Sequence, residues 1–135
     1  MKTLTFPANF DHLDEIREFV GRQARSAGFG EKEIYSIQLA ADEAATNVIE
    51  HAYAGIANGK IELTCEFGDG RLKISLRDHG ASFDPSAIAE PDLKSDLAHR
   101  KIGGLGIYIM RKLMDEIHYE TTPRGNLLIM VKRKG

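Results

Sequence analysis

The chain has 135 residues, of which 42% are hydrophobic and 28% charged. This length suits one domain, residues 1–135, and the ordinary composition argues against wholesale disorder. The 18 basic and 20 acidic side chains give no general attraction to nucleic acid, and the single cysteine, Cys65, excludes an internal disulfide. No Cys/His cluster suits structural zinc, and no apolar run is long enough for a membrane span. We therefore expect a soluble cytoplasmic protein.

Hydrophobic periodicity predicts helices and strands in a defined order. In chain order we expect an edge strand at 4–6, helices over about 13–27 and 31–53, a hairpin of 61–66 and 72–77, a helix over 107–117, and a hairpin of 119–122 and 126–132. Successive strands are mostly hairpin partners. The sequence therefore predicts an α+β fold, with helices packed on one face of a mixed, largely antiparallel sheet.

A long segment without any period separates the third helix from the first hairpin. Residues 78–104 contain two prolines, several glycines and several charges. A loop of more than twenty residues is unusual in a compact domain, and such loops are often lids or binding loops. We expect a lid at about 83–102.

The second predicted helix carries a carboxylate and an amide, Glu43 and Asn47, four residues apart on one face. Glu50 and His51 extend this polar stripe by another turn. The stripe could simply be a solvated helix face. Alternatively, the carboxylate could orient a nucleophile beside an amide that ligates a hard cation such as Mg²⁺, which prefers oxygen ligands.

Two glycine-containing segments are further candidates. Asp78-His79-Gly80 follows a strand, where it could be an ordinary turn or could accept a hydrogen bond from the exocyclic amine of a base. Gly103-Gly104-Leu105-Gly106 opens the third helix, as a flexible connector or as a backbone that approaches phosphate. The chain has no Walker A loop and no complete dinucleotide-binding fingerprint.

These segments occur in the order E-x-x-x-N, D-x-G, long loop and G-G-x-G, which is similar to the GHKL (Bergerat) ATP-binding fold. Residues 43–53 and 78–85 narrow the resemblance to anti-sigma-factor serine kinases of the RsbW/SpoIIAB type. The resemblance covers essentially the entire chain. It implies a two-layer α/β sandwich. Ser82 and Asn126 stand where the wider superfamily often has glycine and threonine.

The resemblance also implies a role for each matching residue. Glu43 would be the general base, and Asn47 would ligate Mg²⁺ bound to ATP. Asp78 would accept a hydrogen bond from the adenine amino group, and Gly80 would leave room for the ring. Backbone N–H groups of the glycine segment would bind the phosphates; the segment consists of Gly103, Gly104, Leu105 and Gly106. Arg100 and Lys101 are candidates for balancing the charge of the phosphates.

The implied function is an ATP-dependent protein serine/threonine kinase that uses ATP/ADP and Mg²⁺. It would phosphorylate a STAS-like anti-sigma-factor antagonist and sequester a sigma factor, as a homodimer, without binding nucleic acid or membrane. Two alternatives remain open at this point. One is a non-catalytic adenine-nucleotide switch, and the other is the ATP-binding domain of a histidine kinase.

Overall fold

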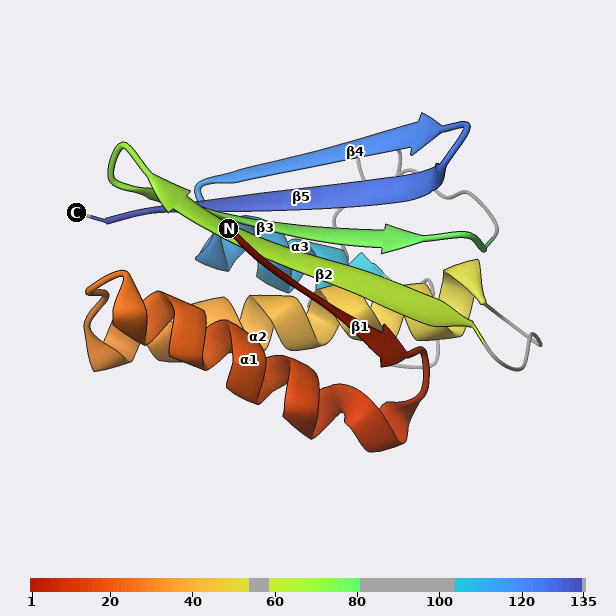
Figure 1. Cartoon of the computed structure of the whole chain (residues 1–135), viewed down its shortest axis with the longest axis horizontal. Coiled ribbons are helices and arrows are strands. Elements are labelled where there is room, and N and C mark those ends of the chain that lie inside the picture. The colour runs from red at the N-terminus through yellow and green to blue at the C-terminus, as the bar shows by residue number, and fades with distance from the viewer. Residues whose placement is uncertain (54–58, 81–103, 135) are drawn as a thin grey trace.

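The computed structural model describes residues 1–53, 59–80 and 104–134. In this part of the chain, five strands form one sheet of order β1-β2-β3-β5-β4, and every pairing is antiparallel. The helices cover one face of the sheet (Figure 1). The elements are β1 (Lys2–Pro7), η1 (Phe10–His12), α1 (Leu13–Ser26), α2 (Glu31–Asn47), η2 (Val48–Ala52), β2 (Lys60–Gly68), β3 (Arg71–Asp78), α3 (Gly104–Leu113), β4 (Glu116–Thr122) and β5 (Gly125–Arg133). The predicted α+β class is confirmed.

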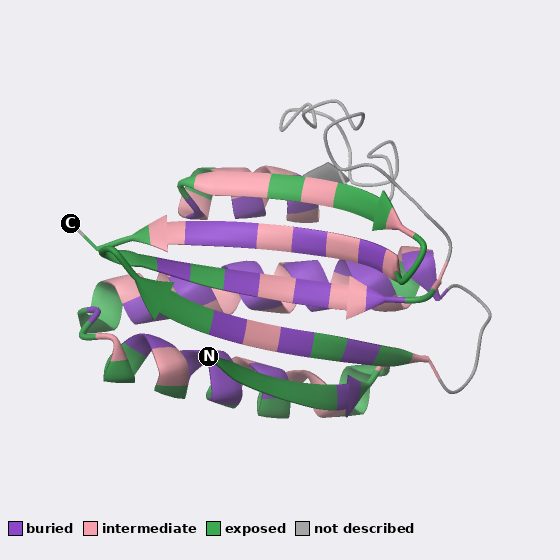
Figure 2. Ribbon diagram, turned by 45° about the horizontal axis from the view of Figure 1, so that its top comes forward, coloured by how far each residue is buried: buried purple, intermediate pink, exposed green. Residues whose placement is uncertain are grey.

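The core lies between the sheet and the helices. Alternate residues of β2, β3 and β5 are buried, as the banding in Figure 2 shows. Alternation of this kind is expected when one face of a sheet is covered and the other faces water. On α2 the buried positions include four alanines, whose small side chains let the helix approach its neighbours closely: Ala40, Ala41, Ala44 and Ala45.

Two predicted boundaries differ from the structure. The second helix does not remain α-helical to residue 53, because it changes to the π-helical turn η2 after Asn47. Ile117, expected on the third helix, lies on β4 opposite Met130. The last helical bond runs from Met114 N to Met110 O, and the next amide, Asp115 N, donates to Val131 O of β5 instead. The switch to strand pairing thus occurs at residue 115.

Several predicted features fall outside the described residues. The predicted lid at 83–102 is one of them, and so are Arg100, Lys101 and Gly103. In the part of the chain that is described, no helix is long and apolar enough to cross a membrane.

The burial pattern of β5 generates a stability prediction. Leu128 is buried against the helices, whereas its neighbour Leu127 is half-buried and points to the other face. We expect Leu128→Ala to lower the free energy of unfolding by about 2–5 kcal/mol, because it removes apolar contacts and leaves a cavity. Leu127→Ala, the matched control, should cost clearly less. Equal losses in urea unfolding would contradict this assignment of the two faces.

Candidate functional site

The carboxylate and the amide predicted on the second helix both lie in the last turn and a half of α2. Asn47 is only 2% exposed, and its Nδ2 donates to the main-chain carbonyl oxygen of Glu43 over 3.0 Å. This bond uses one of the two hydrogens on the amide nitrogen and fixes the side chain. The fixed side chain can also offer Oδ1, an oxygen of the kind that Mg²⁺ prefers. The donor set therefore fits a hard cation.

The electrostatic surroundings of Glu43 make it a better base. The pKa of Glu43 is raised above its usual value, mainly because the half-buried carboxylate loses water, and further because Asp42 and Glu50 place negative charge nearby. A carboxylate with a raised pKa binds a proton more readily than an ordinary glutamate. Glu43 is therefore a stronger base than an exposed glutamate.

The first turn of α3 lies directly against this pair. A Cβ placed on Gly106 would be 2.9 Å from Glu43 Oε2 and 3.0 Å from Asn47 Nδ2. Such distances are shorter than ordinary van der Waals contacts, so a larger residue at 106 would displace the Glu43 carboxylate. The N-terminus of a helix presents free N–H groups and positive partial charge, which suit phosphate. The structure thus brings Gly106, in the first turn of α3, together with Glu43 and Asn47.

The predicted adenine-binding turn follows β3. Asp78 is 3% exposed, and its Oδ1 accepts hydrogen bonds of 2.9 Å from both Gly80 N and Asn126 Nδ2. Within the described residues no hydrogen bond reaches Oδ2. Asp78 therefore keeps one oxygen for a ligand while the other holds the turn.

Asn126 of β5 and Tyr53, which follows η2, contact this turn, and sequence reasoning did not assign them to the site. Asn126 lies opposite Asp78 in the β3–β5 register, and its Nδ2 also donates to Gly80 O over 3.0 Å. Tyr53 binds the main chain of His79 through its hydroxyl. The position of Asn126 near the start of the last strand was a signal, since the superfamily has a polar residue there. No spacing rule pointed to Tyr53.

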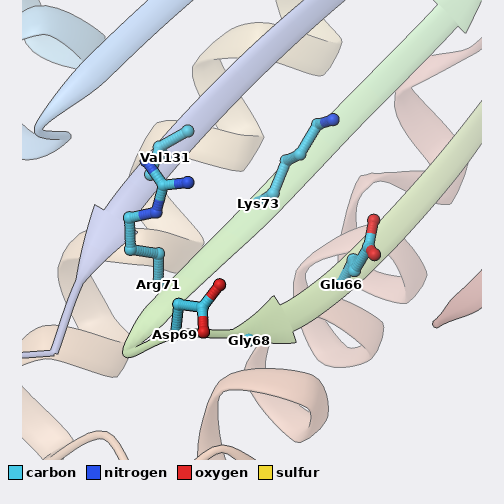
Figure 3. A pocket seen from close by; sticks show the side chains of 6 residues that line it. All are labelled: Glu66, Gly68, Asp69, Arg71, Lys73 and Val131. Carbon is cyan, nitrogen blue, oxygen red and sulfur yellow. The ribbon is translucent and has the colours of Figure 1, made fainter.

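A separate hollow lies on the other face of the sheet, near the β2–β3 turn (Figure 3). It has a volume of about 260 Å³ and is lined by Glu66, Gly68, Asp69, Arg71, Lys73 and Val131. Two of its lining side chains are acidic and two are basic, and none of the predicted site residues contributes to it. The candidate site is therefore the region around α2, α3 and the end of β3.

Comparison with known proteins shows which family the chain belongs to. Residues 6–132 match the model of the histidine kinase-like ATPase domain. The serine-protein kinase RsbW of Listeria monocytogenes serovar 1/2a is 31% identical over 119 residues, which cover 85% of this chain and 76% of the relative.

Solved structures share the fold. The crystal structure of the RsbU and RsbW domains of a Mycobacterium tuberculosis protein matches with a TM-score of 0.67 at 18% identity, covering 98% of this chain and 32% of that one. The catalytic domain of histidine kinase ThkA matches with a TM-score of 0.59 at 21% identity, covering 99% of each chain. From the family model and the sequence relatives together, the chain belongs to the histidine kinase-like ATPase family and, within it, to the RsbW serine-protein kinases.

Proposed function

We propose that this chain transfers the γ-phosphoryl group of ATP to a serine or threonine of a protein that antagonises an anti-sigma factor. The observation that carries the proposal is the contact of the first turn of α3 with Glu43 and Asn47 at Gly106. This contact supports a phosphate site beside a base of raised pKa. The RsbW relatives, which are named serine-protein kinases, support a protein hydroxyl as the acceptor.

In the proposed mechanism, the residues of this chain mainly position the reactants. Oδ2 of Asp78 accepts a hydrogen bond from the adenine amine, and the backbone N–H groups of residues 104–106 bind the phosphates. Glu43 accepts the proton of the attacking serine or threonine hydroxyl. The hydroxyl oxygen forms a bond to the γ-phosphorus while the bond between the γ-phosphorus and the bridging oxygen of the β-phosphate breaks, and ADP leaves. Asn47 Oδ1 would hold Mg²⁺, which neutralises phosphate charge.

The proposed release of the phosphorylated antagonist follows from the negative charge that the reaction adds to it. A phosphoserine carries nearly two negative charges at neutral pH, which would weaken an interface with a kinase whose reactive carboxylate is close by. We propose that the unphosphorylated antagonist and a sigma factor compete for the kinase, and that phosphorylation releases the antagonist. A homodimer, cytoplasmic location and a lid at residues 83–102 belong to the same proposal, as do Gly103, Arg100 and Lys101 as phosphate contacts.

Glu43→Gln tests the transfer step. Glutamine keeps the size and hydrogen bonding of the side chain but cannot take the proton, so we expect transfer in a single turnover to fall by about 100-fold or more. ATP affinity should stay near the native value. In the native protein, kcat/KM should decline as pH falls through the raised pKa of Glu43, at a higher pH than for an ordinary glutamate. This pH limb should be missing in the variant.

Glu18→Gln is the matched control, because Glu18 is exposed on α1 and should leave both transfer and its pH profile unchanged. Native-like transfer by Glu43→Gln would remove Glu43 as the base. If the native chain binds ATP tightly but phosphorylates no cognate antagonist, the protein is a nucleotide-binding switch.

Asp78→Asn tests adenine recognition. Asparagine keeps Oδ1 for Gly80 and Asn126 but replaces Oδ2 with a donor, so the fold should persist while ATP affinity falls by about 1–3 kcal/mol. Relative affinity for GTP should rise, because guanine presents a carbonyl where adenine presents an amine. Calorimetry with both nucleotides measures this change. An unchanged ATP to GTP ratio would contradict the role of Asp78.

A further inference from the structure

The side chain of Tyr53 joins two parts of the site that are distant in sequence. Tyr53 directly follows η2 and is 7% exposed. Its hydroxyl donates to the carbonyl oxygen of Lys60 over 2.7 Å and accepts a hydrogen bond of 2.8 Å from the backbone N–H of His79. His79, the central residue of the turn, is therefore linked through this hydroxyl to the start of β2.

The tyrosine ring has little freedom to move. A Cβ on Gly59 would lie only 2.7 Å from atoms of the ring, so the ring packs on bare backbone. The main-chain N of Tyr53 donates to Val48 O over 3.0 Å, a bond that spans five residues and belongs to the π-helical turn. Because both ring and backbone are held, the position of the hydroxyl is set by the end of the helix.

A second contact attaches the same turn to the same helical end. A Cβ on Gly80 would collide with the carbonyl group of Ala52, the residue before Tyr53. The turn thus meets the helix at two adjacent points, one through van der Waals contact and one through a hydrogen bond. Since η2 continues α2, the turn is held against the helical segment that also carries Glu43 and Asn47.

We propose that Tyr53 is a positioning residue for adenine recognition, because its hydroxyl sets the distance between the Asp78-His79-Gly80 turn and the Glu43–Asn47 pair. This inference rests on the proposed function. ATP must reach both the adenine-binding turn and the phosphate site at the start of α3, so the distance between these two places has to match the length of the nucleotide. Tyr53 contacts neither the nucleotide nor the acceptor in this account, and acts through His79.

The hydroxyl is the part of Tyr53 that carries the role. In the chain from His79 N–H through the tyrosine hydroxyl to Lys60 C=O, each hydrogen bond polarises the next. Phenylalanine would fill the same space beside Gly59 but would leave the N–H and the carbonyl without this partner, which favours a shifted turn. Tyr53→Phe therefore removes the positioning bond with little change in packing.

Steady-state kinetics and binding on Tyr53→Phe test the proposal. We expect KM for ATP to rise roughly 10-fold at an almost unchanged kcat, because Glu43 and the phosphate site are intact once ATP is bound. The affinity of the variant for inorganic tripolyphosphate with Mg²⁺ should equal that of the native protein, since this probe contains no adenine ring. The preference for ATP over GTP should fall roughly 10-fold, which a purely structural role would not produce.

Two controls separate positioning from general loss of stability. Tyr35→Phe makes the same change on α2 at a side chain that is 68% exposed, and should alter nothing. Ile16→Val in the core of α1 should lower stability by about 0.5–1.5 kcal/mol and leave KM unchanged.

Each remaining outcome overturns the inference. If Tyr53→Phe loses stability with native KM, or weakens ATP and tripolyphosphate equally, Tyr53 has a structural role only. In both cases a native chain that still prefers ATP to GTP leaves the proposed function standing. If the native chain itself shows no preference for adenine, the proposed function and the inference both fail.

Discussion

The site depends on one close contact, that of the first turn of α3 with the end of α2 at Gly106. Because this residue has no side chain, the first turn of α3 lies so close to the Glu43 carboxylate and the Asn47 amide that a Cβ at position 106 would be only 2.9 Å and 3.0 Å from them. In the proposed function, this contact brings a phosphate-binding backbone, a general base and an oxygen ligand for a hard cation together on rigid elements. Phosphoryl transfer relies mainly on such positioning and on charge stabilisation.

The helical segment formed by α2 and η2 is the common support of both ends of the site. At residues 43 and 47 it carries the polar pair, and at residues 52 and 53 it holds the turn that follows β3. The π-helical turn lies between these two points. Single π-helical turns are frequent at functional sites, since the extra residue reorients the side chains that follow. Here it leads from Asn47 to the two residues that contact the Asp78-His79-Gly80 turn, so in our proposal it sets the position of that turn relative to Glu43.

Much of the fold could be predicted because its periodic signals are strong. Alternation in residues 61–66 and 72–77 gave the central hairpin, and four-residue spacing placed Glu43 beside Asn47. Ile117 was misplaced because its spacing from Met114 suits a helix equally well, and only pairing with β5 decides the matter. Tyr53 and Asn126 were missed as contacts of the turn because their roles depend on tertiary hydrogen bonds, which no local spacing encodes.

Single-turnover phosphoryl transfer by Gly106→Ala tests the central claim most directly. The new methyl group would lie 2.9 Å from Glu43 Oε2, so the flexible carboxylate must move. Alanine favours helix over glycine, but the methyl group would also lie 3.0 Å from Nδ2 of the buried Asn47, so the free energy of unfolding is measured on the same variant. Misplacement of a reacting group by about 1 Å can cost 100-fold, so we expect transfer to fall by about 10–100-fold, whereas Gly68→Ala, with open space around its Cβ, should transfer normally. Native transfer by Gly106→Ala would contradict the account.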